Sequence, residues 1–168
     1  MEQLSKESLK IAVFGALNAG KTTFVERLSG QELFLKGEFE SITTSFDFVQ
    51  IEQHGILIHL FASPGHRRFS FMWETLATGM DGAILLIDST VGITPVDYEL
   101  VEFIESYNVP YVVAANKEDI SKLSTDFIRK QLKLSEGITI WNTSALNDDN
   151  LSSFMDNLIQ DINKSENK

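Results

Sequence analysis

The stretch Gly15-Ala16-Leu17-Asn18-Ala19-Gly20-Lys21-Thr22 decides the fold. It matches the pattern G-x-x-x-x-G-K-[ST] and lies between an apolar run, 9–14, and a segment of helical periodicity, 21–28. In this pattern the backbone N–H groups of the loop and the helix N-terminus cradle phosphate groups. We expect the Lys21 ammonium to bridge the terminal phosphates and the Thr22 hydroxyl to bind Mg²⁺. The alternative is a glycine turn that matches the pattern by chance, and such a turn would need neither a buried strand before it nor a helix after it.

The rest of the chain alternates short apolar runs with helical patterns. Runs at 46–52 and 56–61, joined at His54-Gly55, predict an antiparallel hairpin. Residues 31–44 show no periodicity and are expected to form a long loop. Further strands are predicted at 82–88, 109–115 and 138–142, and helices at 69–79, 95–107, 125–134 and 147–163. This order predicts an α/β fold of three layers with a six-stranded, mostly parallel sheet and one antiparallel strand.

Composition and charge exclude several classes of protein. A chain of 168 residues predicts one domain, 1–168, with its folded core at about 9–163. The net charge of −10 argues against nucleic-acid binding, and the absence of cysteine excludes disulfides, thiol chemistry and prenylation. The absence of cysteine is typical of the reducing cytoplasm, and no targeting signal, lipid anchor or membrane-spanning run is found, so we expect a cytoplasmic protein. We also expect a monomer.

A second motif indicates which nucleotide is bound. Asn116-Lys117-Glu118-Asp119 directly follows the apolar run 111–115, at the edge of the sheet where open α/β folds bind ligands. A carboxylate at Asp119 can accept hydrogen bonds from both N1–H and the exocyclic amine of guanine, and adenine lacks that pair of donors. Thr143-Ser144-Ala145 closes the next predicted strand. Together with the glycine-rich loop, these residues favour GTP over ATP.

With its motifs in this order, the sequence resembles the Ras-like small GTPases of the P-loop NTPase class over nearly the whole chain. It looks closest to Arf-like forms and to single-domain bacterial and archaeal GTPases of cell polarity and motility. The resemblance implies a G domain in which Thr43 in switch I binds Mg²⁺ and Gly65 in switch II contacts the γ-phosphate. The nucleotide-binding residues it implies are Gly15, Asn18, Ala19, Gly20, Lys21, Thr22, Thr23, Asn116, Lys117, Asp119, Ser144 and Ala145, with Asn116 joining the loops, Lys117 along the base and the Ala145 backbone on guanine O6.

The sequence departs from this family at the metal site. Switch II usually begins with an Asp that holds a Mg²⁺-bound water, and the aligned residue here is Ala62. Asp47 is a candidate substitute, because it follows Thr43 by four residues, and in an extended chain this spacing puts both residues on the same face. The alternative is a strand residue that faces solvent. Asp88 also follows an apolar strand, and we interpret it as a structural loop cap.

Hydrolysis is expected to be slow without a partner. His66 stands where Ras-like proteins usually carry the Gln that orients the attacking water, and an imidazole can take that role. The catalytic residues we predict are therefore His66, Lys21 and Gly65. The switch I loop offers no arginine finger, and the bulky Leu17 would crowd one from a partner. The alternatives are a non-hydrolysing GTP-binding module and a G domain of the translation or ribosome-assembly type, suggested by Pro64-Gly65-His66.

Partner proteins are implied rather than identified. An activator, an exchange factor and an effector are expected for a GTPase of this kind. The resemblance to polarity GTPases suggests a roadblock-type regulator, and also recruitment to a membrane or cell pole through a protein partner. In the predicted helix 69–79, Phe69 and Phe71 point in different directions, so one of them is a candidate exposed anchor.

Overall fold

The computed structural model describes residues 8–16, 19–29, 38–39, 42–43, 47–63, 71–116, 123–142 and 151–166. The strands are β1 (Ser8–Gly15), β2 (Glu38–Phe39), β3 (Ile42–Thr43), β4 (Asp47–Gln53), β5 (Ile56–Ala62), β6 (Gly82–Asp88), β7 (Tyr111–Asn116) and β8 (Ile140–Asn142). The helices are α1 (Lys21–Ser29), α2 (Phe71–Ala77), α3 (Pro95–Glu105), α4 (Thr125–Leu132) and α5 (Leu151–Glu166).

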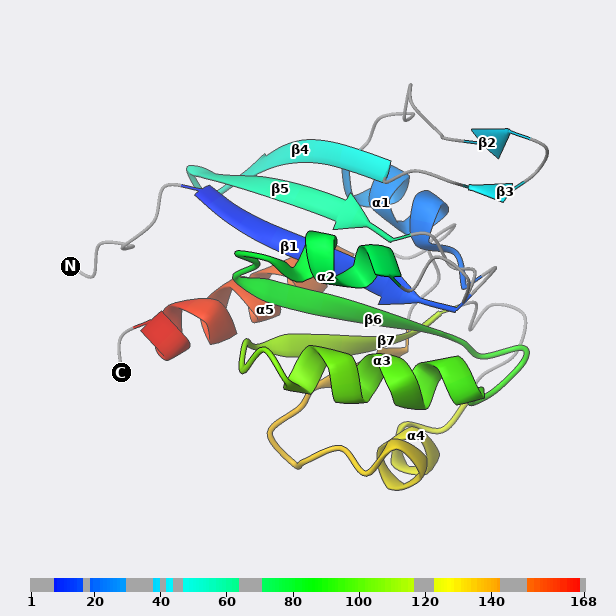
Figure 1. Cartoon of the computed structure of the whole chain (residues 1–168). Coiled ribbons are helices and arrows are strands. Elements are labelled where there is room, and N and C mark those ends of the chain that lie inside the picture. The colour runs from blue at the N-terminus through cyan, green and yellow to red at the C-terminus, as the bar shows by residue number, and fades with distance from the viewer. Residues whose placement is uncertain are drawn as a thin grey trace.

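Six of the strands form one sheet in the order β4-β5-β1-β6-β7-β8. The pairs β5–β1, β1–β6, β6–β7 and β7–β8 are parallel, and β4 is antiparallel to β5. The predicted α/β architecture, with a mostly parallel sheet and one antiparallel strand, is confirmed. The carboxyl ends of β1, β5, β6 and β7 consequently meet at one edge, on the right in Figure 1, where such sheets bind ligands.

Helices cover both faces of the sheet (Figure 1). On one face, α1 and α5 bury Ile11, Val13, Ile84 and Leu86 in a cluster that includes Phe24 and Phe154. On the other face, α2, α3 and α4 bury a second cluster, which contains Phe14, Leu85, Ile87, Leu100 and Ile128. Because β6 and β7 are covered on both sides, every residue of both strands is buried, which explains their continuous apolar runs.

The strands and helices lie close to the predicted ranges, with one correction. The predicted long loop at 31–44 contains a short antiparallel pair, in which Glu38 is opposite Thr43 and Phe39 opposite Ile42. Two-residue strands carry no periodicity, so the sequence pattern could not reveal them. The helices α2, α3 and α4 each end two residues earlier than predicted, and residues 147–150, the predicted start of the last helix, lie outside the described residues.

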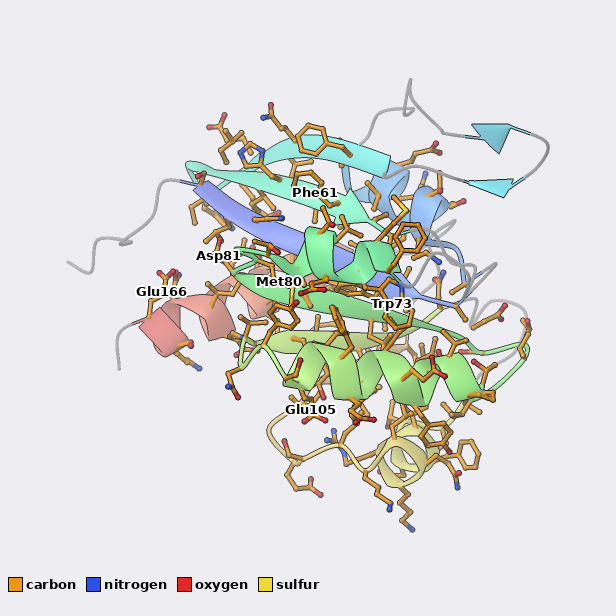
Figure 2. The ribbon with its side chains drawn as sticks, in the orientation of Figure 1. Phe61, Trp73, Met80, Asp81, Glu105 and Glu166 are labelled. Atoms are coloured by element: carbon orange, nitrogen blue, oxygen red, sulfur yellow. The ribbon has the colours of Figure 1, made fainter. Side chains whose placement is uncertain are left out.

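Helix α2 has one buried side and one strongly exposed aromatic. Trp73, Leu76 and, just after the helix, Met80 are buried, and Figure 2 shows Trp73 between α2 and α3, where its ring centroid lies 5.6 Å from that of Phe103. Phe71 is 72% exposed. Of the two candidate anchors, Phe71 is thus exposed, and Phe69 lies outside the described residues. No described helix is long and apolar enough to cross a bilayer.

Candidate nucleotide-binding site

The glycine-rich loop joins β1 to α1 under tight steric limits. A Cβ added at Gly15 would stand 2.9 Å from the Leu86 carbonyl oxygen of β6, so only glycine lets the loop leave the sheet there. Gly20 has φ of +96°, a left-handed conformation that side chains rarely adopt. The two glycines of the motif are therefore required by backbone geometry in this structure.

Lys21, the first residue of α1, is folded back onto the loop. Its side-chain Nζ donates hydrogen bonds to the carbonyl oxygens of Gly15, at 2.8 Å, and Ala16, at 2.9 Å. Only 8% of the residue is exposed. A buried ammonium held by two backbone carbonyls is a strong electrostatic partner for phosphate, because little solvent screens it.

Asn116, at the carboxyl end of β7, connects a second strand to this loop. Its side-chain Nδ2 donates to the carbonyl oxygen of Ala19, at 3.0 Å, and the residue is 2% exposed. A Cβ on Gly20 would lie 2.6 Å from the same Nδ2 atom. The contact is the link between loops that the resemblance implied for Asn116, and it positions the start of the second motif beside the phosphate loop.

Two buried carboxylates lie on the β6–α3 side of the loop. Asp88, at the end of β6, accepts hydrogen bonds from the backbone N–H and the hydroxyl of Thr90, as expected of a loop cap. Asp97 is 1% exposed and accepts from the backbone N–H of Thr94, at 2.8 Å, and from its hydroxyl, at 2.9 Å. These contacts form a capping box at the start of α3.

Asp97 was not singled out from the sequence, although Thr94-Pro95-Val96-Asp97 carries the pattern of a helix start. Burial raises the pKa of its carboxyl group, opposed by the hydrogen bonds from Thr94 and by the positive charge of Lys21, while the negative charge of Asp88 raises it further. The charge of Lys21 therefore acts on the capping carboxylate. The sequence could show the cap but not its burial.

The structure describes only part of the predicted site. Gly15, Ala19, Gly20, Lys21, Thr22, Thr23 and Asn116 come together at the carboxyl edge of the sheet. Thr43 ends β3 and Asp47 begins β4. The predicted residues outside the described part are Asn18, Gly65, His66, Lys117, Asp119, Ser144 and Ala145.

The oxygen atoms at this edge fit Mg²⁺ in their chemistry. Thr22 is in the first turn of α1, and the hydroxyl of Ser63, directly after β5, is buried without a hydrogen-bond partner among the described residues. Mg²⁺ takes hydroxyl, carboxylate, phosphate and water oxygens and keeps several waters, so it needs few protein ligands. Within the described ranges, no group of three or more His, Cys, Asp or Glu side chains could hold a metal ion by itself.

The two described histidines, His54 and His59, contact different residues and do not form a metal site together. His54, in the β4–β5 turn, has its Nε2 atom 2.9 Å from Asp156 Oδ1 of α5, and Gln53 donates to the same oxygen. His59 of β5 contacts the Gln50 side chain of β4. Both contacts hold the hairpin in place, the first by linking it to α5 and the second by linking its two strands.

Comparison with known proteins identifies the family. Residues 35–164 match the family described as the elongation factor Tu GTP binding domain. This chain belongs to that family. It is therefore a P-loop GTPase domain, a G domain, and the expected GTP-binding fold is confirmed, whereas the expected closeness to Arf-like proteins is not confirmed.

The relatives of this G domain include translation factors. It is 34% identical over 122 residues to the uncharacterized protein MJ1339 of Methanocaldococcus jannaschii, covering 73% of this chain and 78% of that protein. It is 30% identical over 122 residues to translation initiation factor IF-2 of Allorhizobium ampelinum, covering 73% of this chain but only 13% of IF-2.

A solved structure with the same fold is elongation factor SelB from Methanococcus maripaludis in complex with the GTP analogue GppNHp. Its TM-score is 0.79 at 20% sequence identity, covering 96% of this chain and 35% of that one. At this identity the likeness shows the fold alone. The G domain thus corresponds to one part of these larger factors.

Proposed function

We propose that this G domain is a molecular switch that binds GTP and GDP with Mg²⁺ and slowly hydrolyses GTP to GDP and phosphate. The observation that supports it is the phosphate loop itself, in which Lys21 is buried on the carbonyls of Gly15 and Ala16 while Asn116 holds Ala19. Family membership supports the choice of guanine nucleotide.

The roles of the individual residues follow from their chemistry. Lys21 binds the terminal phosphates, and Thr22 with Thr43 holds Mg²⁺, which neutralises charge on the phosphate oxygens when it is bound. Gly65 donates its N–H to the γ-phosphate and His66 orients the attacking water. Loss of the γ-phosphate then releases the two switch loops, which changes the partners that bind.

Guanine specificity is assigned to Asp119, with Lys117 along the base, the Ala145 backbone on O6 and Ser144 beside it. Replacing Asp119 by Asn turns one carboxylate acceptor into a donor, which matches the carbonyl that xanthine carries in place of the guanine amine. We therefore expect Asp119→Asn to lose GTP and to gain xanthosine triphosphate, measured by equilibrium binding of both nucleotides. A protein that binds ATP as tightly as GTP would contradict this assignment.

Partner proteins complete the proposal. An activator, an exchange factor and an effector are proposed, with a roadblock-type regulator as one candidate and the cytoplasm as the site of action, where a protein partner brings the domain to a membrane or cell pole. The exposed Phe71 beside the switch region supports a protein contact. We further propose a monomer that makes no contact with nucleic acid, because a net charge of −10 opposes phosphate backbones.

Particular observations favour two other functions. The match to the elongation factor Tu domain and to IF-2 favours a role in translation or ribosome assembly. Salt-sensitive sedimentation with ribosomes would support that role. The buried methyl group of Ala62 at the metal edge favours a module that binds GTP without hydrolysis.

A single-turnover assay separates these functions. Purified protein is loaded with GTP and excess Mg²⁺, and bound GTP and GDP are followed over hours beside Lys21→Ala and His66→Ala variants. We expect slow conversion in the natural protein, a loss of conversion in His66→Ala with binding retained, and a loss of binding in Lys21→Ala. Bound GTP that never converts, even with added cell lysate, would favour the non-hydrolysing module.

A further inference from the structure

The turn between β4 and β5 is joined to α5 through one carboxylate. The Nε2 atom of His54 lies 2.9 Å from Oδ1 of Asp156, and the side chain of Gln53 donates a hydrogen bond to the same oxygen. The sequence separations of these two contacts are 102 and 103 positions. Two neighbouring residues of the turn therefore meet at a single atom of a helix that is distant in the sequence.

The backbone of this turn does not favour a histidine. His54 has φ of +54° and Gly55 has φ of +78°, so both central residues are left-handed, as in a type I′ turn. Asn-Gly is a usual sequence for such a turn, because most side chains are uncommon in this conformation. The His54 side chain is 70% exposed, so burial does not account for it. What the imidazole adds to the turn is the contact with Asp156.

The far end of the same hairpin lies at the nucleotide edge. In Figure 1 the turn is at the left end of β4 and β5, and the carboxyl edge of the sheet is at the right. The two strands pair without interruption from the turn to Asp47 and Ala62. There the backbone N–H of Ser63 donates to the carbonyl oxygen of Val13 at 3.0 Å, two residues before the phosphate loop begins. The hairpin thus connects the contact with Asp156 to the phosphate loop.

The inner face of the hairpin packs under the phosphate loop. Val49 of β4 and Ala62 of β5 are buried in one cluster with Ala19, which belongs to that loop. Met155, the residue before Asp156, is buried in the same cluster. Close-packed interiors transmit displacements instead of absorbing them. A shift of the hairpin relative to α5 would consequently change the packing beneath the loop.

We propose that Asp156 is a positioning residue for nucleotide retention, because it holds the β4–β5 turn against α5 and so fixes the hairpin that packs under the phosphate loop. The inference rests on the proposed function, since it concerns how firmly the same site keeps its nucleotide. Asp156 acts through the hairpin and not by contact with the nucleotide. An exposed contact of this kind contributes little to global stability, so its loss should change nucleotide release more than unfolding.

The test is the rate at which bound nucleotide is released. Release of a fluorescent GDP analogue in millimolar Mg²⁺ is measured for the natural protein, Asp156→Ala, Asp156→Asn and the control Asp161→Ala. Asparagine keeps a side-chain oxygen that accepts hydrogen bonds, and Asp161 is another acid of α5, whose contact is with Asn157 of the same helix. We expect release from Asp156→Ala to be about 3-fold faster or more, with an unchanged urea midpoint. Asp156→Asn should lie closer to the natural rate, and Asp161→Ala should match it.

The variant His54→Gly separates positioning from stability. Glycine accepts the left-handed backbone and removes the imidazole, so unfolding should require no less urea, whereas release should still be faster. If Asp156→Ala does not fold, this variant decides. Natural release rates in both Asp156→Ala and His54→Gly overturn the inference, as does an equal acceleration in Asp161→Ala. A natural protein that retains no guanine nucleotide would instead contradict the proposed function.

Discussion

The side chain of Asn116 donates a hydrogen bond to the carbonyl oxygen of Ala19, at 3.0 Å, and so joins the end of β7 to the phosphate loop. Both residues are buried, and 97 positions of sequence separate them. A buried hydrogen bond of this kind fixes the distance between the loop and the strand from which the base-recognition motif continues. We therefore predict that this amide couples the proposed phosphate site to the proposed base site.

Replacing Asn116 tests this coupling. In Asn116→Ala the buried Ala19 carbonyl loses its donor, which costs about 1–3 kcal/mol. We expect GDP and GTP affinity to fall by about 10-fold or more, in calorimetric titrations, as the loop loses its fixed position. Tyr98→Phe is a suitable control, because it removes a side-chain hydrogen bond, to Gln131, between α3 and α4. Equal affinities in Asn116→Ala and the natural protein would show that the contact does not support binding.

Gly20 provides a second test at the same place. An alanine at position 20 would have to adopt a backbone φ of +96°, and its Cβ would lie 2.6 Å from Asn116 Nδ2. Backbone strain of this kind costs about 1–3 kcal/mol. We expect Gly20→Ala to abolish nucleotide retention on a desalting column. The double variant with Asn116→Ala removes the clash but not the backbone strain, so partial recovery is expected, and full recovery would show that strain at Gly20 is unimportant.

Particular elements show what the sequence could reveal. The strand predicted at 82–88 matches β6 at both ends, because all of its residues are buried and polar residues or glycine bound the run. The pair β2–β3 was missed because two residues carry no period. The phosphate loop followed from local spacing, but the burial of Asp97 near Lys21 depends on how α3 packs against the sheet, which no local pattern encodes.

The raised pKa of Asp97 predicts how the free energy of unfolding depends on pH. Its pKa is raised in the folded protein above the usual aspartate value of 3.8, because burial disfavours the charged form, so folding favours the protonated form. The stability that this group contributes is present at pH below 3.8 and is lost as the pH rises through the raised pKa. Asp97→Asn keeps an acceptor for Thr94 without the charge. Urea denaturation should therefore show the variant gaining stability relative to the natural protein as the pH rises above 3.8.

Thr94→Val is the matched control, because it removes the hydroxyl donor of the capping box and keeps the Asp97 charge. Its difference in free energy of unfolding from the natural protein should vary less with pH than that of Asp97→Asn. A constant difference between Asp97→Asn and the natural protein across this range would show that the carboxyl group titrates normally in the folded state.

Helix α2 makes a prediction that separates stability from partner binding. Trp73 is 7% exposed and packs on Phe103, so Trp73→Ala should lower the free energy of unfolding by about 3–5 kcal/mol. Phe71, two residues earlier, is 72% exposed, and Phe71→Ala should change it by less than about 0.5 kcal/mol. Urea denaturation measures both. If Phe71→Ala destabilises as strongly as Trp73→Ala, Phe71 is a packing residue of the fold, and its exposed ring does not support a protein contact.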